Sequence, residues 1–264
     1  MSKNKNNRQN PPVWVSQNFL TSHKTIQRLL SKTTISHKDH LIEIGPGKGH
    51  TTSHLIELCK KVTAVEIDRK LYERLLEKFR NTKNLTLYNH DFLQWNLPSA
   101  GGYKVFSNIP FCHTTAIIHK LTDNKNPPKE TWLIMEKGAA KRFSGKPCES
   151  QKSLMLKPFF DIDIIYHFLR DDFHPKPGVD VVMIYLKKKE RPDIMPAQKK
   201  LYKKFIEKAY ENKGSGLRRL FTKKQLTRAF KEAGLNEFYS GEILYVQWLC
   251  LFRCYCKYVL SIRE

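Results

Sequence analysis

The sequence is short of acidic residues. It contains 25 Asp and Glu against 47 Lys and Arg in 264 residues, which gives a formal net charge of +22. An excess of positive charge this large destabilises a compact fold by self-repulsion unless a polyanion offsets it. Nucleic acid is therefore the first partner that the composition predicts, and an anionic membrane surface is the second.

Long apolar runs are also absent. The longest, Ile243 to Phe252, contains Gln247 and is too short to span a bilayer. The first eight residues are polar and basic and contain no apolar core of a signal peptide. Since 40% of the residues are hydrophobic and 27% are charged, we expect a soluble globular protein in the cytoplasm, with no part in the membrane.

The pattern of cysteines and histidines does not favour a metal site. Three of the six cysteines, Cys250, Cys254 and Cys256, lie close together in an apolar segment. No histidine follows His174, and the cysteine spacing is not that of a zinc site. In the expected compartment cysteines are reduced thiols. We therefore predict that these three cysteines pack in a core, and we expect no bound metal.

Seven apolar runs predict β-strands, and helical patterns alternate with them. Glycine- and proline-containing turns separate the elements, which is typical of a mostly parallel α/β sheet covered by helices on both faces. The predicted strands are residues 41–44, 62–65, 85–88, 103–106, 132–136, 162–169 and 179–186, and the predicted helices are 23–30, 50–59, 69–79, 115–121 and 137–143.

Two terminal regions differ from this pattern. Residues 1–13 are polar and basic and predict a disordered arm, which leaves residues 14–186 for the α/β domain. Residues 187–264 begin with a charged linker and are helical in pattern, with a capping box at Thr222 and Gln225. They contain 19 Lys and Arg against 8 Asp and Glu, a net charge of +11. A solvated helical cap would fit, but the total charge favours an RNA-binding domain.

A glycine-rich turn, Gly45-Pro46-Gly47-Lys48-Gly49, joins the first predicted strand to a helix. Glycine lets the backbone approach a ligand that a Cβ atom would exclude. Such a turn lies at the carboxyl edge of a doubly wound sheet, where ligands bind. The spacing G-x-G-x-G is neither the dinucleotide pattern G-x-G-x-x-G nor a P-loop. By itself the turn leaves nucleotide phosphates, dinucleotides and S-adenosylmethionine as possible ligands.

Acidic residues follow the next two predicted strands. Glu66 ends the second strand, where a carboxylate accepts hydrogen bonds from both hydroxyls of a ribose. Asp91 follows the third strand, where an acceptor can bind the 6-amino group of adenine. Each acid alone is an ordinary strand-end charge. Together with Gly45, they predict an adenosyl-binding site.

The fourth predicted strand is followed by Ser107-Asn108-Ile109-Pro110-Phe111. Next to an adenosyl site, this segment predicts methyl transfer to an amino nitrogen of a planar ring. The Asn108 side-chain oxygen and the Ile109 carbonyl would accept the amine hydrogens, and Phe111 would stack on the ring. No strong general base is needed, because the methylated nitrogen becomes acidic once it is positive. No Ser/His/Asp triad or pair of carboxylates suggests another chemistry.

The order of these motifs resembles the ribosomal RNA adenine N6-methyltransferases. Two branches compete: the small-subunit dimethyladenosine transferases and the Erm family, which modifies an adenine of 23S rRNA. Four later segments look like Erm. The shared motifs are Gln17–Leu20, Glu43–Gly49, Glu66–Asp68, Asp91 and Asn108–Phe111, and the Erm-like segments are Met135–Phe143, Phe173–Pro177, Leu220–Gln225 and Gln247–Leu249.

The resemblance implies a Rossmann-like class I methyltransferase with a mostly parallel seven-stranded sheet and a small all-α C-terminal domain. It implies that Asn108, Ile109, Pro110 and Phe111 form the catalytic segment, and that Phe111 and Phe173 bind the flipped adenine from opposite sides. Phe111 departs from the family, which usually has tyrosine there. The implied S-adenosylmethionine contacts are Asn18, Leu20, Gly45, Gly47, Glu66, Asp91 and Asn108.

The function implied by the Erm resemblance is N6-methylation of one adenine of 23S rRNA. Its consequence would be resistance to macrolides, lincosamides and streptogramin B. The expected cofactor is S-adenosylmethionine, the expected partner is 23S rRNA, and the expected state is a monomer. Two alternatives remain open: a 16S rRNA adenine dimethyltransferase, and a non-catalytic RNA- or DNA-binding factor on the same fold. The sequence leaves open whether one or two methyl groups are added.

Overall fold

The structure is a computed structural model of the chain, and it describes residues 18–211, 215–236 and 242–260. The predicted basic arm of residues 1–13 and Gln17 lie outside the described residues. No helix among the described residues is long and apolar enough to cross a membrane.

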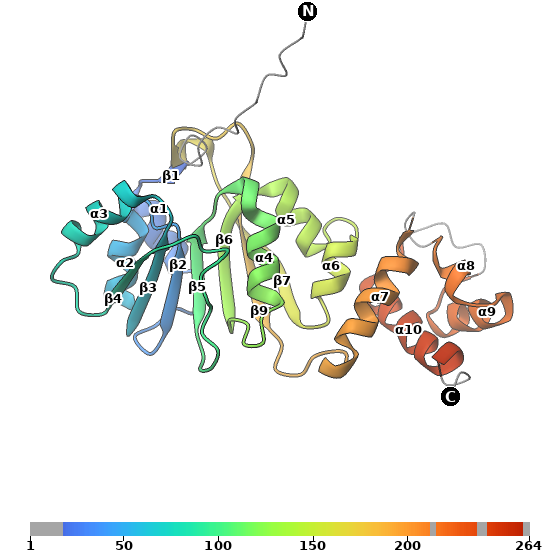
Figure 1. The fold of residues 1–264 in the computed structure, drawn as a ribbon. Helices are drawn as coiled ribbons and strands as arrows, with labels where there is room; N and C mark the ends of the chain where they lie inside the picture. Colours follow the sequence, from blue (N-terminus) through green and yellow to red (C-terminus); the bar gives the residue numbers. More distant parts are fainter. Residues whose placement is uncertain (1–17, 212–214, 237–241, 261–264) are drawn as a thin grey trace, which may run out of the picture. The chain divides into compact units, whose positions relative to one another are not determined.

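A seven-stranded sheet forms the centre of the fold (Figure 1). The pairings of β3 with β4, β2 with β3, β2 with β5 and β5 with β6 are all parallel. The predicted mostly parallel sheet is therefore confirmed. In their order across the sheet, the strands are β4 (Leu85–Asn89), β3 (Lys61–Glu66), β2 (His40–Ile44), β5 (Lys104–Asn108), β6 (Glu130–Glu136), β9 (Val181–Lys188) and β7 (Phe160–His167).

The predicted elements differ from the observed ones mainly at their ends. The predicted strand at 103–106 was too short, because Ser107 and Asn108 continue β5 by pairing with Leu133 and Ile134 of β6. Helix α6 and a two-stranded sheet of β1 (Phe19–Leu20) and β8 (Phe173–His174) were not predicted. These elements are only two to six residues long, which is too short for periodicity to show in the sequence.

The chain divides into two compact units. The first unit comprises residues 1–136 and 166–183, and the second comprises residues 137–165 and 184–264. The chain passes between the units at three points: between Glu136 and Lys137, after β6, and then within β7 and within β9. This division assigns 137–165 to the unit that contains the C-terminal helices. The predicted boundary after Leu186 and the RNA-binding role of residues 187–264 stay predictions.

Two helices of the first unit, α1 and α3, begin at strong capping residues. Ser22 accepts a hydrogen bond from the backbone N–H of Thr25 at the start of α1, and Asp68 accepts one from Leu71 at the start of α3. Their buried apolar faces pack next to the buried residues of the sheet. The helices are α1 (His23–Leu30), α2 (His50–Leu58), α3 (Arg69–Lys78), η2 (Phe111–His113), α4 (Thr114–Thr122) and η3 (Arg170–Asp172).

The second unit contains a separate hydrophobic core. Cys254 is buried in this core, and Cys250 and Cys256 pack against it, so the predicted packing of these cysteines is confirmed. The predicted capping box at Thr222 and Gln225 is also present. The helices of this unit are α5 (Lys137–Ser144), α6 (Gln151–Leu156), η4 (Pro196–Gln198), α7 (Lys199–Ala209), α8 (Leu217–Leu220), α9 (Lys223–Glu232), α10 (Tyr245–Tyr255) and the π-helix η6 (Cys256–Leu260).

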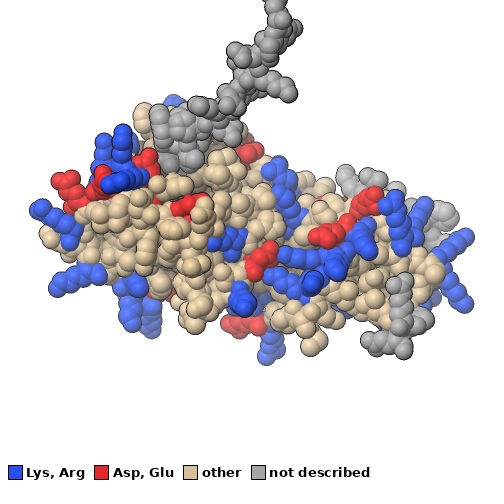
Figure 2. Space-filling model, viewed as in Figure 1, with Lys and Arg blue, Asp and Glu red and all other residues tan. Residues whose placement is uncertain are grey.

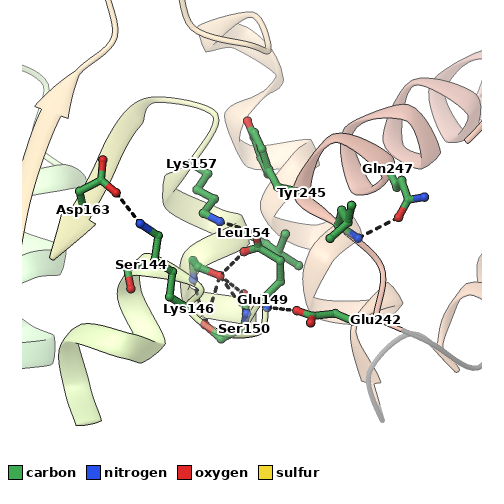
Figure 3. A network of polar contacts seen from close by, with 12 residues as sticks. Ser144, Lys146, Glu149, Ser150, Leu154, Lys157, Asp163, Glu242, Tyr245 and Gln247 are labelled. Carbon is green, nitrogen blue, oxygen red and sulfur yellow. Dashed lines mark hydrogen bonds and ion pairs between the residues drawn. The ribbon is translucent and has the colours of Figure 1, made fainter. Parts of the chain in front are cut away.

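A polar network around Glu149 joins segments of the second unit that are far apart in the sequence (Figure 3). The Glu149 carboxylate forms an ion pair with Lys157 and accepts a hydrogen bond from the Ser153 hydroxyl at 2.7 Å. Its carbonyl accepts a hydrogen bond from the Tyr210 hydroxyl at 2.7 Å, and its N–H donates to Glu242. Because each buried polar group has a partner, the network fixes α6 to the C-terminal helices.

Candidate active site at the carboxyl edge of the sheet

The predicted site residues follow four neighbouring strands of the first unit. Strands β4, β3, β2 and β5 are adjacent and parallel, so their carboxyl ends meet at one edge of the sheet. Gly45, Glu66, Asp91 and Asn108 lie at or just beyond these ends. The chain runs from β2 through β3 to β4 and then returns to the other side of β2 as β5. Ligands bind at such a topological switch point in α/β sheets.

A pocket opens at this switch point. It is lined by Asn18, Phe19, Gly45 and the segment from Asn108 to Phe111. The fold thus brings together residues that the sequence separates by up to 93 positions. The sequence predicts no role for Phe19, because nothing in a single sequence shows that this residue lines the pocket.

Backbone hydrogen bonds fix the segment from Asn108 to Phe111. The Ile109 N–H donates to the Ile134 carbonyl at 3.2 Å, and the Ile109 side chain is buried. The Phe111 carbonyl accepts a hydrogen bond from the Thr114 hydroxyl at 2.9 Å. Phe111 is half-buried at the start of η2. The segment therefore presents a fixed backbone and a partly exposed ring to the pocket.

Two glycines shape the turn after β2. Gly45 has φ of +62°. A Cβ atom at this position would meet no atom within 4 Å, so there is open space beside Gly45 at the pocket wall. Gly47 has φ of +58°, and a Cβ atom there would lie 2.7 Å from the Phe19 ring. Since only glycine adopts such φ values without strain, both positions require glycine. The Lys78 ammonium donates to the Lys48 and Gly49 carbonyls at 3.3 and 3.2 Å and so holds the turn.

Glu66 ends β3 with a completely buried side chain. Its carboxylate accepts hydrogen bonds from the N–H groups of Gly47 at 3.0 Å and Asp68 at 2.9 Å. Burial raises the pKa of this carboxyl, and the two N–H groups oppose that shift. A carboxylate has about four acceptor sites, so each oxygen retains one for a ligand hydroxyl. Glu66 lies beside the glycine turn but is not among the residues that line the pocket, and its contact with a ribose stays a prediction.

Asp91 lies in a tight turn after β4. One carboxylate oxygen accepts a hydrogen bond from the Leu93 N–H at 2.8 Å, and the other accepts one from the Gln94 side chain at 3.3 Å. Lys120 donates to the Leu93 carbonyl at 3.0 Å and holds this turn against α4. Asp91 is not among the residues that line the pocket. Its contact with a cofactor stays a prediction.

Leu20 and Phe173 lie opposite each other in the short sheet of β1 and β8. Each is only 3% exposed. The Phe173 ring packs against Phe168, with 5.1 Å between ring centroids, and Phe173 does not line the pocket. In the structure Phe173 pairs with Leu20 of β1 and packs against Phe168. Its stacking on a target base stays a prediction.

Glu43 is a buried acid behind the glycine turn that the sequence reading did not single out. Its carboxylate accepts a hydrogen bond from the Thr52 hydroxyl of α2 at 2.7 Å. Burial raises the pKa of Glu43 to about 8, and the neighbouring charge of Glu66 adds to the shift. Glu43 therefore carries a proton at neutral pH. The sequence could not show this, because strand periodicity does not reveal the partner of a buried acid.

The residues at this edge fit S-adenosylmethionine. The open space at Gly45 and the buried acceptor Glu66 suit a ligand with a ribose and a chain that runs along the backbone. The fold and the site define a Rossmann-like, S-adenosylmethionine-dependent methyltransferase. The crystal structure of the 23S rRNA methyltransferase ErmE is similar, with a TM-score of 0.81 and 26% identity over 90% of this chain and 99% of that one. A dimethyladenosine transferase from Plasmodium falciparum shares the fold, with a TM-score of 0.70 and 20% identity over 88% of this chain and 95% of that one.

Sequence comparison places the chain within this class. The family model described as ribosomal RNA adenine dimethylase matches residues 9–241. An rRNA adenine N-6-methyltransferase from Lysinibacillus sphaericus is 36% identical over 91% of this chain and 95% of its own length. One from Staphylococcus aureus is 35% identical over 94% of this chain and 98% of its own length. The chain therefore belongs to the ribosomal RNA adenine dimethylase family, and the predicted family, cofactor and enzyme class are confirmed.

Proposed function

We propose that the protein methylates N6 of one adenine in 23S rRNA and so confers resistance to macrolides, lincosamides and streptogramin B. The pocket formed by Asn18, Gly45 and Asn108 to Phe111 carries this proposal, because it joins the cofactor turn to a segment suited to a planar amine. The Erm-like segments favour the large-subunit target. The likeness to a 23S rRNA methyltransferase adds support.

The chemistry at the pocket depends on holding and polarising the amine. S-adenosylmethionine supplies the methyl group when it is bound. An exocyclic base amine is a poor nucleophile, since its lone pair is delocalised into the ring. The Asn108 side-chain oxygen and the Ile109 carbonyl accept its two hydrogens and so favour the tetrahedral nitrogen of the transition state. Phe111 stacks on the flipped base and aligns it.

The cofactor is held by residues at the ends of the four strands. Glu66 accepts the ribose hydroxyls, Asp91 accepts the adenine amino group, and Gly45 and Gly47 allow close approach of the backbone. Asn18, Leu20 and Asn108 complete the binding set. No metal takes part. The phenylalanine at position 111 provides the aromatic face that stacking requires without the phenol hydroxyl of the usual tyrosine.

RNA binding is assigned to the C-terminal helices. Lys223, Lys224, Arg228 and Lys231 are exposed along one side of α9, at successive spacings of one, four and three residues. The other side docks on the unit: Ala229 is buried, and Gln225 donates to the Tyr258 carbonyl at 2.7 Å. Within the described residues, Lys223, Lys224 and Lys231 form no ion pair. An exposed row of unpaired cations suits the phosphates of an RNA backbone. Figure 2 shows many Lys and Arg and few Asp and Glu over the C-terminal helices.

Growth on erythromycin tests the proposed function. A macrolide-sensitive bacterium that expresses the wild-type chain should grow, because the added methyl groups block the antibiotic site and remove a hydrogen-bond donor. A strain that expresses the Asn108→Ala variant to the same level should stay sensitive. Sensitivity of the wild-type strain despite abundant folded protein would contradict the 23S assignment. Since ribosomes are cytoplasmic, we propose the cytoplasm as the location of the protein. We also propose that its active form is a monomer.

A further inference from the structure

The side-chain amide of Asn108 is held in one orientation by the backbone of Asn18. The Asn108 Nδ2 donates to the Asn18 carbonyl at 2.7 Å. A carbonyl oxygen only accepts hydrogen bonds. The opposite orientation would bring Oδ1 of Asn108 against the Asn18 oxygen, and the two acceptors would repel each other. The Asn18 carbonyl therefore determines that the Nδ2 atom of Asn108, and not its Oδ1 atom, points toward Asn18.

The Asn18 carbonyl is itself fixed by its neighbours in the chain. Phe19 and Leu20 pair with His174 and Phe173 in the sheet of β1 and β8. The Phe19 ring lies against the Gly47 backbone, at a distance that leaves no room for a Cβ atom, and the Lys48 ammonium lies 5.1 Å from its centroid. The Leu20 side chain is buried. Asn18 therefore enters the pocket from an anchored strand.

We propose that the Asn18 backbone carbonyl is a positioning group for methyl transfer, because it directs Oδ1 of Asn108 toward the target amine and requires an amide at position 108. This inference rests on the proposed role of Asn108 as acceptor. It goes beyond that role by stating why the acceptor must be a carboxamide. A carboxylate would also accept the amine hydrogens, but it has no donor for Asn18.

The Asn108→Asp variant tests the inference through pH. When the new carboxyl is ionised, it faces the Asn18 carbonyl with no hydrogen to donate; when protonated, it donates to Asn18 and keeps a free carbonyl oxygen. We expect Asn108→Asp to be at least 100-fold less active than wild type at pH 8. Its activity relative to wild type should rise at least tenfold between pH 8 and pH 5.5. Relative activity that does not change with pH would overturn the inference.

A second measurement does not depend on activity. Repulsion from Asn18 raises the pKa of the new carboxyl in the folded state, so ionisation weakens folding. The midpoint of thermal unfolding of Asn108→Asp should fall further below that of wild type at pH 8 than at pH 5.5. An equal difference at both pH values would contradict the proposed contact.

The Asn108→Ala variant separates this inference from the proposed function. If Asn108→Ala is fully active, the role of Asn108 as acceptor is wrong. If Asn108→Ala is inactive and Asn108→Asp equals wild type at every pH, the acceptor role stands and the positioning role of Asn18 is wrong.

The anchoring of β1 is tested at Phe19. Phe19→Ala should lower kcat about tenfold by freeing β1, and Phe19→Tyr, which keeps the ring, should retain the wild-type kcat. Equal loss in both Phe19 variants would contradict the anchoring of β1 by the ring.

Discussion

The two units of the molecule place their polar side chains differently. In the first unit, Glu66 and Asn108 are held by hydrogen bonds to backbone groups at the edge where four strands end, and Asn108 lines the pocket there. In the second unit, the cations of α9 are exposed and lie on a helix whose opposite face is docked. Catalysis requires groups held in one geometry, whereas phosphate binding requires charge more than geometry. The difference predicts that single substitutions disable the first unit and that only combined substitutions disable the second.

The largest effect is expected for Asn108→Ala. Removal of the amide leaves the target amine with one acceptor and releases Asn18, so methyl transfer should fall at least 1000-fold. Binding of S-adenosylmethionine, measured by calorimetry, should be largely retained. Normal methyl transfer by this variant would contradict the proposed mechanism.

Phe111→Ala should lower methyl transfer by about 10- to 100-fold, because stacking of a base on an aromatic ring contributes about 1–3 kcal/mol. Phe111→Tyr is the matched control and should retain nearly all activity, since the ring face is unchanged. Steady-state kinetics with an rRNA transcript measure both variants. A large loss in the tyrosine variant would show that more than the ring face matters.

A combined charge reversal on α9 should lower rRNA affinity by about tenfold or more at 150 mM salt. In the variant Lys223→Glu, Lys224→Glu and Lys231→Glu, the salt dependence of binding should become shallower, because fewer counterions are released. Acidic residues at 223 and 224, in the first turn of α9, favour the helix, whereas an acidic residue at 231, in its last turn, disfavours it, so circular dichroism is used to check that the variant is folded. The control replaces exposed lysines of the first unit: Lys32→Glu, Lys38→Glu and Lys60→Glu. An equal loss of rRNA affinity in both variants would contradict a specific role of α9, because net charge alone would then explain the loss.

The last prediction concerns stability rather than activity. Because the folded-state pKa of Glu43 is raised from 4.5 to about 8, the folded protein keeps a proton that the unfolded chain releases. The free energy of unfolding therefore decreases as pH rises through this window, by up to about 1.4 kcal/mol per pH unit. Glu43→Gln should remove this contribution and be more stable than wild type at pH 8. Urea unfolding at pH 5 and pH 8 measures the free energy of unfolding of wild type and Glu43→Gln. An equal change with pH in the two proteins would contradict a protonated Glu43.

The sequence predicted most of the sheet and the residues that follow its strands. The apolar strand at 41–44 and the amphipathic helix at 69–79 have clear patterns, and motif order connects them to a family. The proximity of Gly45 and Asn108 could be expected because β2 and β5 are parallel, whereas Asn18 was expected at the site only from the family resemblance.

Other features depend on tertiary contacts that one sequence does not show. The pairing of Phe19 with His174 joins segments 155 residues apart, and the two strands are too short for a pattern. The placement of residues 137–165 with the C-terminal helices depends on the Glu149 network. The proton on Glu43 depends on burial and on the nearby charge of Glu66, both of which raise its pKa, while the Thr52 hydroxyl opposes the shift. The helix or strand propensity of a segment does not indicate such long-range partners.

Mapping of the transferred methyl group tests the central claim most directly. Purified 23S and 16S rRNA transcripts are incubated with isotope-labelled S-adenosylmethionine and either wild-type protein or the Asn108→Ala variant, and the labelled nucleotide is located by mass spectrometry. The pocket predicts N6-labelled adenine at one position of 23S rRNA with wild-type protein and none with Asn108→Ala. Label in 16S rRNA, at another atom, or undiminished in the variant would contradict it.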